Sequence, residues 1–513
     1  MKGLPTAVSS CSFIKKNKIR RFHVKRQVFN PYLPLWEYVP DGEPRVFDGR
    51  LYIFGSHDRA GGKSFCLNDY VAWSCPEDDL SDWRYEGVIF RKDQTPWNTK
   101  NEVYYAPDVV QGPDGRFYMF YFVANTSILS VAVCDKPAGK YEYYGDLHLP
   151  DGRVYGSKSE DWFTFDPGVL VDDDGRIWVY TGSGQTSNGR FGHEIKGCFV
   201  MELDKDMLTI ISEPKIVLPA DWDMKKPSFF EGPSIRHIGE YYYLVYPTSN
   251  QTGLNYAVSK SPTGPFTHKG SIHSTSEVGL NGRTMKDALY PLGNNHGGLV
   301  CVKGQWYIFD HRMTNGTMFS RQGVAEPVTI KEDGTIDTVE VTSCGLNGGP
   351  LSGKGTYPAG ICCTMRGRFP FSIMLGTPKV TQDGPDYEPQ NPEEAGHEIN
   401  ADTESGAPVS YVKNIKRNSV LGYRYFDITE TENITLELRG KGKGKIQILS
   451  AEDGRPAATL QFEGSDGWTT VTSKLDTAAM LDDKSKQEAL KKMPILIKFL
   501  GRGKIDLKCF TLS

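Results

Sequence analysis

The 513-residue sequence has no long hydrophobic run, no marked excess of one charge and no regular cysteine spacing. No stretch approaches the roughly 18 consecutive apolar residues that a membrane-spanning helix needs. The 59 Lys and Arg residues are balanced by 63 Asp and Glu residues, which indicates neither nucleic acid nor a membrane surface as a partner. The ten cysteines are scattered, apart from the adjacent Cys362 and Cys363, and they predict neither a metal-binding motif nor a disulfide framework.

The basic segment 1–26 lacks the apolar core of a signal peptide, which together with the scattered cysteines predicts a cytoplasmic protein. A chain of this length is expected to form two or three domains. The 54 glycines, 31 prolines, 26 tyrosines and 25 phenylalanines favour short strands joined by tight turns. The composition therefore predicts an all-β protein.

A turn glycine followed by an aromatic-rich strand occurs five times, as in DGRLYIF from Asp48 and DGRFYMF from Asp114. The spacings between successive turn glycines are 66, 60, 64 and 65 residues, and each leaves room for about four short strands. Four antiparallel strands repeated radially form a propeller blade, so this repeat predicts a five-bladed β-propeller. The five turn glycines are Gly49, Gly115, Gly175, Gly239 and Gly304.

One titratable residue precedes each turn glycine by seven to nine residues and lies next to Pro or Gly. If the intervening segments are the innermost strands, these residues converge on one end of the central channel. A ring of carboxylates is unfavourable for folding because like charges are crowded and desolvated, so function explains it better than stability does. The five residues are Asp41, Asp108, Asp166, Glu231 and His296.

Structural roles remain open for two of these residues. Asp108, in APDV, is as well explained by a turn as by chemistry, and His296 as well by a buried hydrogen-bonded histidine as by a ligand. The matching positions of Asp41, Asp166 and Glu231 favour catalysis. The acidic run 172–174 fits a solvated hairpin turn better than a calcium loop.

The ordered motifs YVPDGEP, FDPGVLVDDDG and FFEGPSIRH resemble glycoside hydrolase family 43, and the resemblance extends from about Asn30 to Arg321. It implies an inverting hydrolase in which Asp41 is the general base and Glu231 the general acid. Asp166 is implied as the carboxylate that orients the acid and raises its pKa. Inversion needs two carboxylates roughly 6.5–9.5 Å apart, and a third carboxylate favours a protonated acid near neutral pH.

The same resemblance implies further site residues. His296 is expected to help hold a hydrated calcium ion in the channel, since calcium prefers oxygen ligands that water can supply. Arg312, in DHR, is expected to contact the terminal sugar. Tyr105, which replaces the family's usual tryptophan, is expected to form the subsite wall, and Asp108 is grouped with the substrate-binding residues.

The remainder of the chain predicts a second domain. Seven short strand-like runs near the C-terminus indicate a β-sandwich, with a jelly-roll-like arrangement that resembles a family 6 carbohydrate-binding module. Its Trp468 and Tyr423 are either sugar-stacking or core residues. The predicted segments are a basic region 1–26, the propeller 27–325, an extension bracing the propeller 326–381, an acidic linker 382–405 and the sandwich 406–513.

Together these features predict an exo-acting enzyme that removes terminal α-L-arabinofuranose from plant-type oligosaccharides or polysaccharides. A β-xylosidase or a galactofuranosidase on the same scaffold is the first alternative. A non-catalytic, carbohydrate-binding propeller is an alternative of another class, and it does not explain why three acidic residues stand at matching positions. No oligomeric state is predicted.

Overall fold

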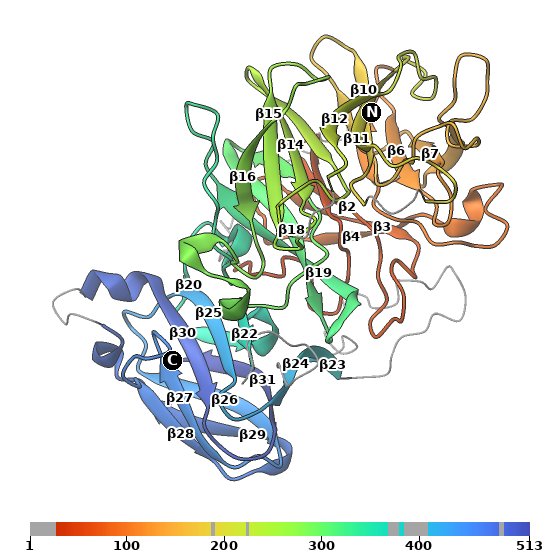
Figure 1. The fold of residues 1–513 in the computed structure, drawn as a ribbon. Coiled ribbons are helices and arrows are strands. Elements are labelled where there is room, and N and C mark those ends of the chain that lie inside the picture. Colours follow the sequence, from red (N-terminus) through yellow and green to blue (C-terminus); the bar gives the residue numbers. More distant parts are fainter. Residues whose placement is uncertain (1–26, 186–189, 222–224, 368–378, 384–408, 482–486) are drawn as a thin grey trace, which may run out of the picture.

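The computed structural model describes residues 27–185, 190–221, 225–367, 379–383, 409–481 and 487–513 (Figure 1). The predicted basic segment 1–26 and most of the predicted linker lie outside these ranges. Two bodies rich in β-strands lie side by side, and the larger one contains the N-terminal part of the chain. Within the described ranges, no helix is both long and apolar enough to cross a membrane. The nine described cysteines are all free thiols.

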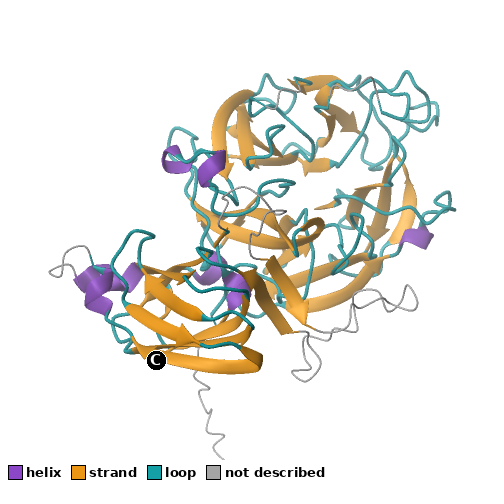
Figure 2. Cartoon of the chain, turned by 60° about the horizontal axis from the view of Figure 1, so that its bottom comes forward, coloured by secondary structure: helices purple, strands orange, loops and turns teal. Residues whose placement is uncertain are grey.

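The larger body consists of five antiparallel sheets that follow one another along the chain. Figure 2 shows these sheets arranged around a common centre. The first strand of each sheet is innermost: β1 contacts β5 and β17, and β9 contacts β5 and β13. The predicted five-bladed propeller is therefore confirmed. Its strands are β1 Glu43–Phe47, β2 Arg50–Phe54, β3 Tyr70–Pro76, β4 Arg84–Phe90, β5 Asp108–Gln111, β6 Phe117–Phe122, β7 Leu129–Cys134, β8 Glu142–Asp146, β9 Gly168–Val171, β10 Ile177–Ser183, β11 Gly197–Leu203, β12 Lys215–Pro219, β13 Ser234–Ile238, β14 Tyr241–Pro247, β15 Leu254–Ser259, β16 Thr267–His273, β17 Leu299–Val302, β18 Gln305–Thr314 and β19 Thr317–Val328.

The second strand of a blade is apolar on both faces because both faces are covered by neighbouring blades. In β6, Tyr118 and Phe120 pack into the core shared with the third blade, while Phe117 and Met119 pack into the core shared with the first blade. Successive side chains point to opposite faces of a strand, so each needs an apolar residue. All five predicted turn glycines adopt positive φ, between 61° and 85°, as a tight turn before such a strand requires.

The fifth blade has three strands, β17, β18 and β19, where the spacing predicted about four. The N-terminal segment covers the free edge of β19. Tyr32 N donates to Gly323 O at 3.3 Å, and the Asn30 side chain both accepts from Ala325 N and donates to Ala325 O. An uncovered edge would present unpaired backbone groups, and this segment pairs them instead.

The smaller body is a β-sandwich, as predicted, but it has two six-stranded sheets where seven strands were expected. Its core contains fully buried Leu421, Tyr423 and Phe510. The first sheet contains β20 Leu351–Ser352, β22 Thr364–Arg366, β25 Val420–Asp427, β27 Gly444–Leu449, β28 Ala458–Phe462 and β30 Met493–Phe499. The second contains β21 Gly355–Pro358, β23 Lys379–Asp383, β24 Val409–Ile415, β26 Asn433–Gly440, β29 Ser465–Lys474 and β31 Ile505–Leu512.

The predicted extension 326–381 serves two bodies instead of one. Residues 330–339 do brace the propeller, where Tyr243 donates to Gly334 O and Val339 N donates to Ile272 O. Strands β20, β21 and β22, however, pair with β25 and β31 of the sandwich. The sandwich therefore begins near Leu351, well before the predicted boundary at residue 406. These pairings join segments about 60 to 150 residues apart in sequence, and no local pattern reveals them.

The two bodies are joined by partly buried polar contacts. Arg424 of the sandwich donates to Glu277 Oε1 at 2.5 Å, and the hydroxyl of Tyr425 donates to Glu340 Oε2 at 2.7 Å. Tyr290, from the segment before β17, packs within the sandwich core. The sandwich is thus docked onto the fourth and fifth blades.

Candidate active site

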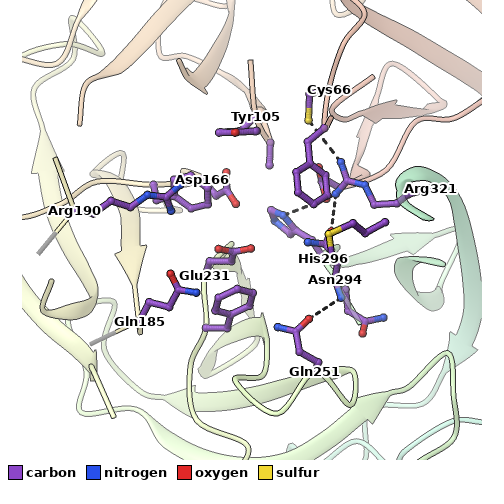
Figure 3. A pocket seen from close by; sticks show the side chains of 17 residues that line it. Cys66, Tyr105, Asp166, Gln185, Arg190, Glu231, Gln251, Asn294, His296 and Arg321 are labelled. Carbon is purple, nitrogen blue, oxygen red and sulfur yellow. Dashed lines mark hydrogen bonds and ion pairs between the residues drawn. The ribbon is translucent and has the colours of Figure 1, made fainter. Parts of the chain in front are cut away.

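A cavity of about 500 Å³ opens at the end of the propeller where the innermost strands begin (Figure 3). Asp41, Asp166 and Glu231 line it, together with His296 and Tyr105. The structure therefore brings together five of the seven predicted site residues. In Figure 3 the side chains of Asp166 and Glu231 point toward the centre from one side, and Arg321 and His296 lie on the other.

Local backbone geometry places the three carboxylates. Asp41 and Asp166 each lie two residues before an innermost strand, β1 or β9, and have positive φ values of 56° and 43°. Positive φ is costly for a residue with a side chain and is concentrated at functional sites. Glu231 is followed by Gly232, with φ 55°, where a Cβ atom would lie 2.7 Å from the His296 ring. The chain thus bends at the same level in three blades and turns each carboxylate into the cavity.

Asp41 is held in its ionised form. Burial would raise its pKa, but the charge of Arg321 is the main influence that lowers it below the usual value. Arg321 Nη1 donates to Asp41 Oδ1 at 2.9 Å, and the Asp41 backbone N–H donates to His311 Nδ1 at 3.1 Å. His311 accepts this bond as a neutral ring, because burial lowers its pKa to about 4. An ionised, positioned carboxylate is suited to accept a proton from water.

Asp166 and Glu231 behave in the opposite way. Burial, together with the charge of Asp41, raises the pKa of Glu231 to about 7 against the lowering effects of Arg190 and Arg321. Burial and the charges of Glu231 and Asp41 also raise the pKa of Asp166 well above its usual range. Two interacting carboxyls of this kind retain a proton between them near neutral pH. One cavity therefore holds both a proton donor and a proton acceptor, as acid–base chemistry requires.

Asp108 does not reach the cavity, so its predicted grouping with substrate-binding residues is wrong. It is the first residue of β5, whereas Asp41 lies two residues before β1, and the equivalent position in the second blade is Ala106, which lines the cavity. Asp108 instead accepts two hydrogen bonds from Arg45, at 2.6 and 3.0 Å, and one from Val169 N at 2.8 Å. It therefore joins three innermost strands, which fits the structural alternative.

The predicted sugar contact of Arg312 is also wrong. Arg312 lies on β18, and its neighbour Met313 pairs with Arg321 of β19. Because side chains alternate across a strand, Arg312 points away from the face that carries Arg321. Its guanidinium donates to the carbonyls of Gly360 and Cys362 and stacks on Tyr290, 5.1 Å from the ring centroid. Arg312 is an interdomain residue.

Arg321, a cation that faces the cavity, was not among the predicted site residues. It is 3% exposed and donates to Asp41, to Asn294 and, through two nitrogens, to Asp58. Its spacing of nine residues from Arg312 does not by itself show its face; the pairing of Met313 with Arg321 places it opposite to Arg312. Arg190, which lines the cavity from the segment between β10 and β11, was missed as well.

A cluster of opposite charges fills the propeller axis beneath His296. Arg236 donates to Glu43 at 2.5 Å and to Pro44 O at 2.9 Å, while Arg45 is bound to Asp108. Ser234 completes the hydrogen bonding of Glu43 at 2.9 Å. Although burial opposes it, Arg236 with Arg45 lowers the pKa of Glu43 below its usual value. Two cations and two carboxylates thus cancel on the axis.

The carboxylates near His296 are not free to bind the hydrated calcium ion predicted beside it, so water would have to supply its oxygen ligands. Calcium takes six to eight oxygen ligands. The carboxylates that interact with His296 are Asp41 and Glu43, and both are already bound by guanidinium groups. Among the described residues, the group of three potential ligand atoms within 4.8 Å of one another is Asp172, Asp173 and His237. Its Asp172 accepts from His237 and Tyr242 in a hairpin turn, as predicted for the run 172–174.

Comparison with known proteins gives consistent matches. The model of the glycosyl hydrolases family 43 matches residues 46–336, which include Asp166 and Glu231; Asp41 lies five residues before the match. A "Xylosidase/arabinosidase" of Thermoclostridium stercorarium is 40% identical over 507 residues, covering 95% of this chain and 99% of that protein. A "Xylosidase/arabinosidase" of Bacteroides ovatus is 28% identical over 344 residues, covering 60% of this chain and 97% of that protein.

Among solved structures, a β-xylosidase/α-arabinofuranosidase from a compost microbial metagenome, in complex with xylotriose and in a calcium-free form, superposes with a TM-score of 0.48. It is 25% identical and covers 60% of this chain and 96% of its own.

Proposed function

Because this chain belongs to family 43 of the glycosyl hydrolases and is therefore a glycosidase, we propose that it removes terminal α-L-arabinofuranosyl and β-D-xylosyl residues with inversion of configuration. The observation that carries this proposal is the contrast between two carboxyls in one cavity. Asp41 is kept ionised by Arg321, whereas Glu231 keeps a proton near neutral pH.

The reaction follows from these two protonation states. Glu231 donates its proton to the glycosidic oxygen as the bond from that oxygen to the anomeric carbon breaks. Asp41 accepts a proton from a water molecule, whose oxygen forms the new bond to the anomeric carbon from the opposite side. The products are a free sugar of inverted configuration and an alcohol, and Glu231 is left ionised while Asp41 is protonated. No step requires a metal ion.

Asp166 and Tyr105 have supporting parts in this proposal. Asp166 lies beside Glu231 and, through their mutual repulsion, favours retention of a proton by the pair. The ring of Tyr105 packs at a tilt against Phe165, another residue of the cavity wall, with the ring centroids 5.5 Å apart. Burial raises the pKa of Tyr105 to about 12, so its hydroxyl stays neutral and can form hydrogen bonds. His296 closes the floor between Asp41 and Gly232.

We propose dual specificity because two relatives, matched by this chain over 99% and 97% of their own length, carry the name xylosidase/arabinosidase. A galactofuranosidase on the same scaffold is the alternative in the same class. A non-catalytic propeller is disfavoured because three buried carboxyls in one cavity are costly unless they are used.

The test is a panel of p-nitrophenyl α-L-arabinofuranoside, β-D-xyloside and β-D-galactofuranoside, with NMR detection of the first anomer released. Turnover of the first two, with the inverted anomer formed first, is expected. Turnover of the galactofuranoside alone would favour the alternative enzyme. Retention of configuration would contradict the roles of Asp41 and Glu231, and no turnover of any glycoside would favour the scaffold.

For the C-terminal sandwich we propose a docked module, related in form to family 6 carbohydrate-binding modules, in which neither of the two predicted aromatics binds sugar. Tyr423 is fully buried in the core. Trp468 is covered by Arg439, 4.5 Å from its ring centroid, and packs on Tyr411. Affinity electrophoresis on arabinoxylan, comparing Glu231→Gln with Glu231→Gln/Trp468→Ala, should show equal retardation. Weaker retardation of the double variant would contradict the proposal.

A further inference from the structure

Arg190 is a cation in the cavity that the reaction described above does not use. It lies on the segment between β10 and β11, and Figure 3 shows its side chain reaching toward Asp166. Three phenylalanine rings hold its guanidinium, with centroid distances of 5.4, 5.1 and 5.5 Å for Phe163, Phe165 and Phe191. Stacking on aromatic rings orders an arginine without neutralising its charge.

The other cation of the cavity is already committed. Arg321 is bound through Nε and Nη2 to Asp58 and through Nη1 to Asp41, so two carboxylates share its one positive charge. Arg190, in the described part of the chain, contacts aromatic rings and no carboxylate at ion-pair distance. Its charge therefore acts across the cavity on the carboxyls that face it.

These carboxyls are Asp166 and Glu231, and the remaining groups around them do not replace Arg190. Tyr105 and Cys66 stay neutral, because burial raises the pKa of the phenol to about 12 and that of the thiol well above its usual value. Asp41 adds negative charge. His296 lies on the floor of the cavity, 3.8 Å from Asp41 Oδ1 and against Gly232.

We propose that Arg190 is the counter-charge of the Asp166–Glu231 pair and sets the strength of the general acid. This inference rests on the proposed role of Glu231. When Glu231 gives its proton to the departing oxygen, the pair passes from one negative charge to two inside a buried cavity. The guanidinium offsets that second charge, in agreement with its lowering effect on the pKa of both carboxyls. Arg190 thus acts as a positioning residue through Glu231.

Two variants separate the charge of Arg190 from its packing. Arg190→Met keeps a long apolar stem over the phenylalanine rings and removes the charge, whereas Arg190→Lys keeps the charge. Lys196→Met is the matched control, because Lys196 stacks on Trp162 at 5.8 Å on the following part of the same segment and does not line the cavity. Thermal unfolding of each variant checks the fold.

The readout is the pH profile of kcat/KM with a p-nitrophenyl glycoside and with a disaccharide, whose sugar hydroxyl is a poor leaving group. For Arg190→Met, the basic limb should move up by about one pH unit, because loss of the guanidinium charge raises the pKa of Glu231. Its rate on the disaccharide should fall about tenfold more than its rate on the aryl glycoside. Arg190→Lys and Lys196→Met should resemble the wild type.

An unchanged basic limb and leaving-group dependence in Arg190→Met would overturn the proposal. So would equal behaviour of Arg190→Met and Arg190→Lys, which would assign the effect to packing. Glu231→Gln, measured alongside, distinguishes this failure from that of the proposed function: if it loses no more activity on the disaccharide than on the aryl glycoside, the acid itself has been misassigned.

Discussion

Arg321 joins Asp41 to Asp58, with Nη1 2.9 Å from Asp41 Oδ1 and Nε 2.8 Å from Asp58 Oδ2. The cation that keeps the general base ionised is therefore braced from behind by a second carboxylate. Arg321 lies on the last strand of the propeller, while both carboxylates belong to the first blade. The contact that closes the ring of blades is thus also the contact that prepares the base.

Replacing Arg321 should reduce the ionised fraction of Asp41 at a given pH. In Arg321→Met the pKa of Asp41 should rise, because burial raises it and its strongest positive partner is lost. The acidic limb of kcat/KM should move to higher pH, and the rate should fall roughly 10²–10⁴-fold, the usual contribution of positioned acid–base catalysis. Arg312→Met is the control: it should lower the melting temperature and leave the acidic limb in place.

Glu231→Ala and Asp41→Ala should respond differently to the leaving group. Glu231→Ala should be strongly impaired on an oligosaccharide and much less on an aryl glycoside, because an acidic phenol leaves without a proton. Asp41→Ala should lose activity on both, since water must be activated whatever departs, and azide should partly restore it by replacing the water. Steady-state kinetics on both substrates checks this, and equal losses for the two variants would leave the assigned roles unsupported.

Chelation should leave the melting temperature and activity unchanged, because Arg45 and Arg236 already balance Glu43 and Asp108 on the axis. Arg236→Met should leave Glu43 buried without its principal partner and lower the free energy of unfolding by about 3–5 kcal/mol. The melting temperature and activity of the wild type are measured with and without EDTA, and the free energy of unfolding of Arg236→Met is measured by denaturation. A fall in the wild-type melting temperature on chelation, reversed by calcium, would restore the predicted ion.

Stability should fall as the pH rises from about 4.5 to about 8. Burial raises the pKa of Glu326 from 4.5 to about 8, so the folded protein holds a proton that the unfolded chain releases. The contribution of Glu326 to stability is present in full below the pKa of the unfolded chain and is lost as the pH passes through the pKa of the folded protein. Between these values the free energy of unfolding falls by no more than about 1.4 kcal/mol per pH unit. Glu326→Gln should flatten this slope in denaturant titrations at several pH values. An unchanged slope would contradict it.

The repeat in the sequence was sufficient to predict the five blades, because a tight turn before a strand requires a glycine locally. The positions of Asp41, Asp166 and Glu231 could be predicted from their distance to these turns. The predicted roles of Asp108 and Arg312 were wrong because of small geometric differences. Asp108 is the first residue of its strand, whereas Asp41 lies two residues before the strand of its own blade. Arg312 lies on the face of β18 that points away from the cavity. Period-two alternation makes a single residue decide which face a side chain takes, and only the pairing of β18 with β19 reveals it.

Strands β20, β21 and β22 come before residue 368, yet they complete sheets whose other described strands begin at residue 379 or later. The C-terminal domain is therefore not a detachable cassette. A chain truncated near Gln382 would keep Tyr357, Ile361 and Met365 without the hydrophobic core that buries them. A graft that starts at residue 406 would lack four strands, β20, β21, β22 and β23. Exchange of this domain between enzymes needs a junction ahead of Leu351, in the loop that follows the brace on the fourth blade.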